Sequence, residues 1–125
     1  MALSIEEAVE QLLHLDGLIA MAAVDCSNGM ILNSHLVQQY DMELAAAAAT
    51  EVLRAEMRAV EQMGGGQDVD DVLIQTTKEM HLLVPSPATS RNAGIFSYLV
   101  LSRDRGNLAL ARRRLHELTE QGVDL

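Results

Sequence analysis

Hydrophobic and polar residues follow two different periods along the chain, and these periods separate helices from strands. Residues 3–14 carry apolar side chains at helical spacing after Ser4, a residue type that caps helices. The run at 17–24 is almost wholly apolar and too short for a helix. It ends in an Asn-Gly turn and returns at 30–32, so we predict a first helix followed by a β-hairpin.

The longest periodic segment spans residues 41–63 and predicts the central helix. It begins with Asp41, is rich in Ala, Leu, Glu, Arg and Met, and is closed by three glycines at 64–66, which lead into an acidic connector at 67–71. The apolar positions on the helical period are Met42, Ala46, Ala49, Leu53, Met57 and Val60. Charged residues occupy much of the remaining surface, so we expect one long face of this helix to be covered.

The second half of the chain reads as three strands and a closing helix. Residues 72–77 and 80–84 predict two paired strands, and 94–101 is apolar at successive positions, which is typical of a central strand. A helix is expected at 108–121. The predicted order is helix, two strands, helix, three strands and helix, which indicates a single α+β domain over residues 1–125.

Composition and charge exclude several kinds of partner. The chain has 125 residues, with 18 acidic and 9 basic side chains and a formal net charge of −9. A surface of this sign repels phosphate backbones and anionic lipids, and the aromatic residues are few: Tyr40, Phe96 and Tyr98. We therefore expect no binding to nucleic acid and no membrane insertion.

The single cysteine and the first residues of the chain indicate in which cellular compartment the protein is expected. Cys26 has no second cysteine with which to form an internal disulfide, and the first ten residues carry acids where a secretory signal has bases. No apolar run reaches the 18 or so residues of a membrane helix. These features predict a cytoplasmic protein.

Candidate catalytic and metal-binding residues do not combine into a site. The four histidines lack the i, i+4 spacing of a helical metal site, and the triple glycine follows a helix instead of the strand that precedes a phosphate loop. Asp25 beside Cys26 raises the pKa of the thiol, which disfavours a nucleophile. The aspartates are explained by caps, turns and a solvated connector. We therefore predict no enzyme activity, no metal and no cofactor.

Five successive alanines at 45–49 put small side chains on every face of the central helix. Two surfaces could approach such a helix closely, one being the sheet and the other a second copy of the chain. The alternative is that alanine is simply the best helix former.

Three local patterns together resemble the Roadblock/dynein light chain family over essentially the whole chain. The first is the apolar strand at 16–25, which ends in Asp before a glycine turn and the strand at 28–32. The second is the strand pair at 72–76 and 80–85, and the third is the last strand at 96–103 with the helix start at 107–112. Each pattern is common alone, and their order and intervals carry the resemblance.

The resemblance implies a five-stranded antiparallel sheet with strand order 2-1-5-4-3 and the central helix on one face. It also implies homodimers in which the third strands pair edge to edge and the central helices lie side by side. Bacterial members of the family look like regulators or scaffolds of small Ras-like GTPases, so a GTPase of this class is the expected partner. No catalytic arginine is implied.

On this basis we assign two sets of residues to contacts. The predicted dimer interface consists of Met42, Ala45, Ala46, Ala49, Leu53, Met57, Val72, Ile74 and Thr76. The predicted partner contacts are Glu43, Arg54 and Arg58. The alternative function is a small-molecule sensor of profilin-like or related fold, which would need convergent polar groups in an apolar pocket between sheet and helix.

Overall fold

The computed structural model describes residues 1–64, 66 and 68–125. Its helices are α1 (Ile5–Leu13), α2 (Met42–Met63) and α3 (Leu108–Gln121). Its longer strands are β2 (Leu18–Asp25), β3 (Ile31–Leu36), β4 (Val72–Gln75), β5 (Glu79–Pro85) and β6 (Ile95–Ser102), and two short strands are β1 (Leu3–Ser4) and β7 (Val123–Asp124). The predicted helices and strands are confirmed within a few residues, with β1 and β7 as additions.

The five longer strands form one sheet in the order β3-β2-β6-β5-β4, and every neighbouring pair is antiparallel. Counted along the chain as five strands, this order is 2-1-5-4-3, so the predicted topology is confirmed. The most apolar strand, β6, lies in the middle as expected. The outer strands are β3 at one end and β4 at the other.

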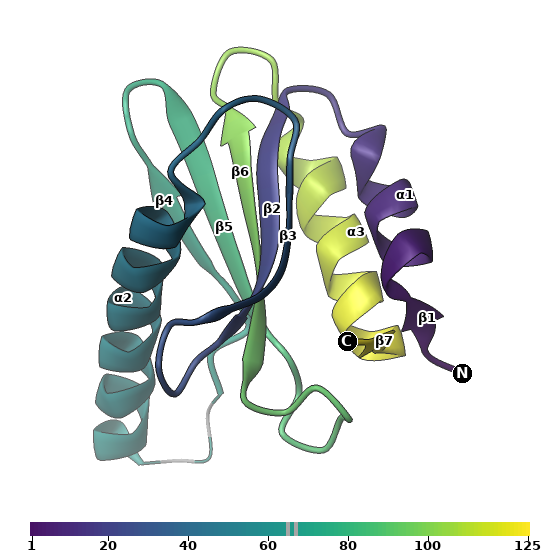
Figure 1. Ribbon diagram of the computed structural model, residues 1–125. Coiled ribbons are helices and arrows are strands. Elements are labelled where there is room, and N and C mark those ends of the chain that lie inside the picture. Colours follow the sequence, from purple (N-terminus) through teal and green to yellow (C-terminus); the bar gives the residue numbers. More distant parts are fainter. Residues whose placement is uncertain (65, 67) are drawn as a thin grey trace.

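The sheet separates two helical layers (Figure 1). Helix α2 covers one face, and α1 and α3 lie side by side on the opposite face. Side chains of successive strand residues point to opposite faces. Phe96, Tyr98 and Val100 of β6 therefore pack with the α2 layer, whereas Leu99 and Leu101 pack with α1 and α3.

Local sequence explains where the helices begin and end. The Ser4 hydroxyl accepts a hydrogen bond from the Glu7 N–H at 3.1 Å, and the Glu7 carboxylate accepts one from the Ser4 N–H at 3.2 Å. The Asp41 carboxylate accepts a bond from the Leu44 N–H at the start of α2. Gly64 ends α2 with a φ of 70°. Gly65 of the predicted glycine stop and Gln67 of the predicted connector lie outside the described residues.

Two features differ from the sequence expectation. Strand β3 runs to Leu36, whereas the apolar pattern predicted a strand at 30–32 only, because the polar residues in its second half resemble a loop. Two short segments near the ends of the chain form a parallel pair of β1 and β7, with Leu3 opposite Val123. No helix among the described residues combines the length and hydropathy that crossing a bilayer requires.

Candidate interaction surface

The inner face of α2 is occupied by the protein's own core. Met42, Ala46, Ala49 and Leu53 are at most 4% exposed and pack on the sheet residues of the α2 layer. Their side chains have no surface to offer a second copy. The assignment of these four residues to the dimer interface is therefore corrected: the helical period located the buried stripe, and this stripe meets the sheet of the same chain.

One flank of α2 faces the turn between β2 and β3. The Arg54 guanidinium donates a hydrogen bond to the Ser27 carbonyl oxygen at 2.6 Å. Gly29, with a φ of 76°, lies against Ala47 and Thr50, where an added Cβ would stand 3.4 Å from the Thr50 hydroxyl oxygen. These contacts define a hairpin-side flank of α2, which points toward the β3 end of the sheet.

The opposite flank of α2 points toward the β4 end of the sheet and carries small apolar residues. We call it the β4-side flank. The 3.6-residue turn of the helix determines which residues lie on this flank. They are Ala45, Ala48, Val52, Ala55, Ala59 and Met63, with Glu56 at the inner border of the flank. Val52 is 42% exposed and Met63 is 66% exposed. Such a surface permits close approach of another helix.

Strand β4 lies beside this flank and is one of the two outer strands of the sheet. Val72 and Ile74 are half-buried against the α2 layer. The Thr76 N–H donates to the Glu79 carbonyl oxygen at 2.9 Å, so the N–H groups of β4 that point at β5 belong to even-numbered residues. By alternation, the backbone groups of Leu73 and Gln75 point outward. The edge and the helical flank together form one continuous candidate surface.

The start of β4 is fixed to α3 by a charged cluster. The Asp71 carboxylate, whose side chain is 9% exposed, accepts bonds from Arg112 Nε at 2.6 Å and Nη2 at 3.1 Å. His116 Nε2 lies 2.7 Å from the same carboxylate. Burial raises the pKa of Asp71, but the hydrogen bonds from His116 and Arg112 outweigh it and hold the pKa below its usual value.

A second polar cluster lies beneath the other end of β4. His81 of β5 pairs with Ile74 in register; its Nδ1 is 2.6 Å from the Tyr98 hydroxyl and its Nε2 is 2.8 Å from a Glu79 carboxylate oxygen. The Tyr40 hydroxyl donates to the same Glu79 oxygen at 3.0 Å. Burial raises the pKa of Tyr98 and Tyr40, so both hydroxyls are protonated at neutral pH. The cluster ties the segment before α2 to β5.

The hairpin-side flank borders a shallow groove that contains two of the predicted partner residues. Arg54 and Arg58 line it with Cys26, Met57 and Glu61. Burial raises the pKa of the Cys26 thiol, which keeps it protonated and unreactive. Glu43 lies on the same flank, because it precedes Arg54 by three helical turns. The three predicted partner residues therefore share one side of α2.

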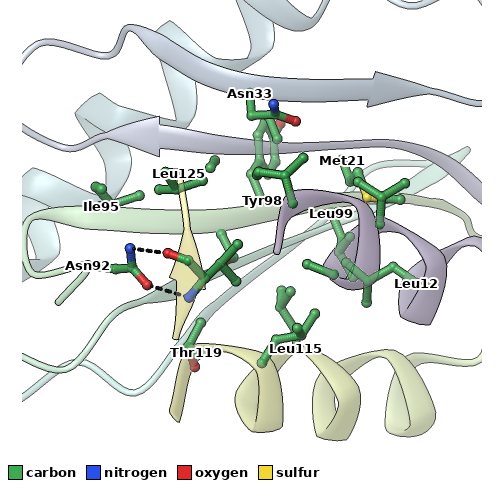
Figure 2. A pocket seen from close by; sticks show the side chains of 18 of the residues that line it. Leu12, Met21, Asn33, Asn92, Ile95, Tyr98, Leu99, Leu115, Thr119 and Leu125 are labelled. Carbon is green, nitrogen blue, oxygen red and sulfur yellow. Dashed lines mark hydrogen bonds between the residues drawn. The ribbon is translucent and has the colours of Figure 1, made fainter. Parts of the chain in front are cut away.

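The other face of the molecule contains a small apolar cavity of about 70 Å³ between the sheet and the α1–α3 layer (Figure 2). Leu12, Met21, Leu99, Leu115 and Leu125 are among its walls. Its walls include the buried polar side chains of Asn92 and Thr119. The Asn92 amide exchanges two 2.9 Å hydrogen bonds with the Val123 backbone, and the Thr119 hydroxyl donates one to the His116 carbonyl oxygen at 2.9 Å. These polar atoms already have partners.

Side chains that could ligate a metal are dispersed over the molecule. Across residues 1–64, 66 and 68–125, no three His, Cys, Asp or Glu side chains are grouped so that they could hold an ion.

Several solved structures have the same arrangement of helices and strands as this chain. A Roadblock/LC7 domain from Streptomyces avermitilis superposes with a TM-score of 0.72 at 16% identity, covering 89% of this chain and 87% of that one. The chain has the Roadblock/LC7 fold. Myxococcus xanthus MglB matches with a TM-score of 0.70 at 13% identity over 92% and 85% of the two chains. The gliding protein MglB of Thermus thermophilus matches at 0.68 and 15% identity over 94% and 91%.

The resemblance inferred from sequence patterns is thus confirmed as a fold. No family model matches the sequence, and no curated protein matches it.

Within this Roadblock fold the remaining predicted interface residues separate into three places. Ala45, Val72 and Ile74 lie at the β4 side, where α2 and the sheet edge meet. Met57 lines the hairpin-side groove instead. The Thr76 hydroxyl accepts bonds from the Lys78 and Glu79 N–H groups and so shapes the β4–β5 turn. Val52, Ala55 and Ala59 of this candidate surface were not singled out in the sequence, because they lie off the buried stripe.

Proposed function

We propose that this chain is a non-catalytic homodimeric module that binds a small Ras-like GTPase and regulates or scaffolds it. The observation that carries the proposal is the Roadblock/LC7 fold shared with MglB structures over more than four-fifths of each chain. The family resemblance implies a GTPase partner of this class. A partner of this kind would place the protein in the cytoplasm.

The proposed dimer joins two β4 edges antiparallel and brings two β4-side flanks of α2 together. The outward backbone groups of Leu73 and Gln75 supply hydrogen bonds across the two-fold axis. Small residues on the flank, such as Ala48 and Val52, let the two helices approach. Val72 and Ile74 lie below the helices and become covered. An MglB structure is described as a tetrameric arrangement, so self-association has a precedent in this fold.

The hairpin-side flank stays free in such a dimer, because it points to the other end of the sheet. We propose that Glu43, Arg54 and Arg58 contact the GTPase there. Arg54 is already bonded to the Ser27 carbonyl oxygen, an arrangement that favours positioning of partner loops over donation of an arginine to the transition state. The dimer would then act by ordering the partner's own machinery.

The experiment begins with copurification of the full chain from native cytosol with and without GTP, followed by single-turnover hydrolysis with the recovered GTPase. Arg54→Ala and Arg58→Ala should each lower stimulated hydrolysis by less than about tenfold, whereas an arginine supplied in trans is worth about a thousandfold or more. A thousandfold loss with binding retained contradicts the loop-ordering route. GTP turnover by the protein alone, or the absence of any GTPase partner, contradicts the proposed function.

The sensor alternative has one observation in its favour, the apolar cavity on the α1–α3 face. Ligand pockets usually place a few free polar groups in an apolar setting. The Asn92 amide is bonded to Val123, and no buried side-chain nitrogen or oxygen among the described residues lacks a partner. We therefore rank the interaction module ahead of the sensor.

A further inference from the structure

The sheet has a second open edge at β3, far from the one assigned to the dimer. Strand β3 is first in the strand order and has β2 as its one neighbour. The Val37 N–H donates to the Ile19 carbonyl oxygen of β2 at 2.9 Å. Because backbone groups alternate along a strand, those of Ser34 and Leu36 point away from β2. They form a short row of donors and acceptors on the outside of the sheet.

Side chains along this edge are symmetric about Ser34. Asn33 and His35 flank it, Leu32 and Leu36 stand two residues away, and Ile31 and Val37 stand three residues away. Leu32 is 48% exposed, Leu36 is 43% exposed and Val37 is 52% exposed. A second copy rotated about Ser34 would therefore meet polar residues with polar ones and leucine with leucine.

Charged residues or proline on an outer strand usually prevent a sheet from pairing with other strands, and this strand has neither. From Cys26 to Tyr40 the sequence holds no Asp, Glu, Lys, Arg or Pro. A bulge at Leu32, between the pairs Ala23–Asn33 and Val24–Ile31, limits the regular edge to the stretch that follows it. In a chain of net charge −9, an uncharged stretch of this kind avoids like-charge repulsion between two copies.

We propose that two copies of this chain pair antiparallel through β3, with a two-fold axis at Ser34. The outward N–H of Ser34 donates to the Ser34 carbonyl of the second copy, and the reciprocal bond closes the pair. His35 lies opposite Asn33 of the second copy on the α1–α3 face, and Leu36 packs near the bulge residue Leu32 of the second copy, which lines the groove beside α2. The symmetric pattern favours a second copy over an unrelated peptide, because each position meets a side chain of its own kind.

This pairing is independent of the proposed β4 dimer, since the two edges lie at opposite ends of the sheet. Used together, the two edges would join dimers into assemblies of four copies or more. The inference thus extends the proposed function from a dimer to an assembling module.

The first experiment measures mass by sedimentation at low and high micromolar concentration. Ser34→Pro removes the outward N–H at a place where an edge strand tolerates proline. It should raise the apparent dissociation constant of the β3 contact by about tenfold or more. Ser34→Thr is the matched control and should keep the wild-type masses. Leu36→Lys, at an exposed position, should weaken the contact while the circular dichroism spectrum stays native.

Gln75→Pro on the other edge separates this inference from the proposed function. If both edges pair, Ser34→Pro and Gln75→Pro each reduce the largest species to a dimer, and the double variant is a monomer. If only β3 pairs, Ser34→Pro is a monomer and Gln75→Pro has no effect on the mass. This result contradicts the β4 dimer of the proposed function and supports the β3 pairing. Equal masses of Ser34→Pro and Ser34→Thr at every concentration overturn the β3 pairing.

A second experiment tests the position of the axis. Two residues on the axis of a hydrogen-bonded antiparallel pair have Cα atoms about 5.5 Å apart, which suits a disulfide. In a Cys26→Ser background, oxidised Ser34→Cys should form a covalent dimer and His35→Cys should not. Cross-linking of His35→Cys in preference to Ser34→Cys would overturn the proposed register.

Discussion

The two outer strands of the sheet each leave one backbone edge open, and their surroundings differ. Strand β4 lies beside the small-residue flank of α2 and is fixed to α3 by Asp71. Strand β3 has exposed leucines on an uncharged, symmetric sequence. An open edge offers hydrogen bonds to any strand, so its side chains and neighbouring elements decide what pairs with it. We therefore expect strand pairing at the β4 edge to depend on the neighbouring helix α2. Strand pairing at the β3 edge should depend on the side chains of β3 itself.

The largest expected effect concerns the packing of α2 on the sheet. Leu53 is fully buried, and Leu53→Ala should lower the free energy of unfolding by about 2–5 kcal/mol through lost packing and a cavity. Its neighbour Val52 is 42% exposed, so Val52→Ala should cost less than about 1 kcal/mol in a monomeric background. Urea unfolding measures both. Equal costs would show that the inner and outer faces of α2 are wrongly assigned.

A smaller effect separates the two edges directly. Asp71→Ala leaves Arg112 and His116 without their shared acceptor and should cost about 2 kcal/mol. Hydrogen exchange should then accelerate in β4 and β5 while the amides of β2 and β3 keep their protection. Asp71→Asn, which retains an acceptor oxygen, is the control and should show an intermediate loss. Uniform acceleration across the sheet would mean that Asp71 has no special role at β4.

Asp71 also predicts a pH dependence. Its pKa is lower in the folded protein than in the unfolded chain, so its contribution to stability is present above the unfolded value and disappears as the pH falls through the folded pKa. The stabilities of wild type and Asp71→Asn should therefore begin to approach each other as the pH falls below about 4 and should meet below the folded pKa. A difference between them that stays constant down to low pH would contradict this assignment.

Much of the fold could be predicted from local patterns. Apolar runs separated by an Asn-Gly turn, the long helix after Asp41 and the apolar strand at the centre are local signals, and the structure confirms them. The second half of β3 was missed because Asn33, Ser34 and His35 on an edge strand lack the alternation of a half-buried one. The β1–β7 pair was missed because it joins the two ends of the chain, a contact that no local pattern records.

The candidate surface was harder to predict than the fold. Helical periodicity located the stripe that contains Ala46 and Leu53, and a sheet was expected on one face of the helix, but these same residues were also assigned to the dimer interface. Both flanks of α2 contain alanine, so sequence alone could not tell which one borders β4. The contacts of Arg54 with Ser27 and of Gly29 with Ala47 settle the orientation, and these depend on tertiary structure.

The central claim is that two copies meet through the β4 edge and the β4-side flank of α2. It is tested most directly by the same substitution at two adjacent exposed alanines, Ala48→Glu on that flank and Ala47→Glu on the hairpin side, in a Ser34→Pro background. Ala48→Glu would bury two like charges near the two-fold axis, at a cost of several kcal/mol. Sedimentation should show a monomer for Ala48→Glu and a dimer for Ala47→Glu. Equal masses for the two variants would contradict the claim.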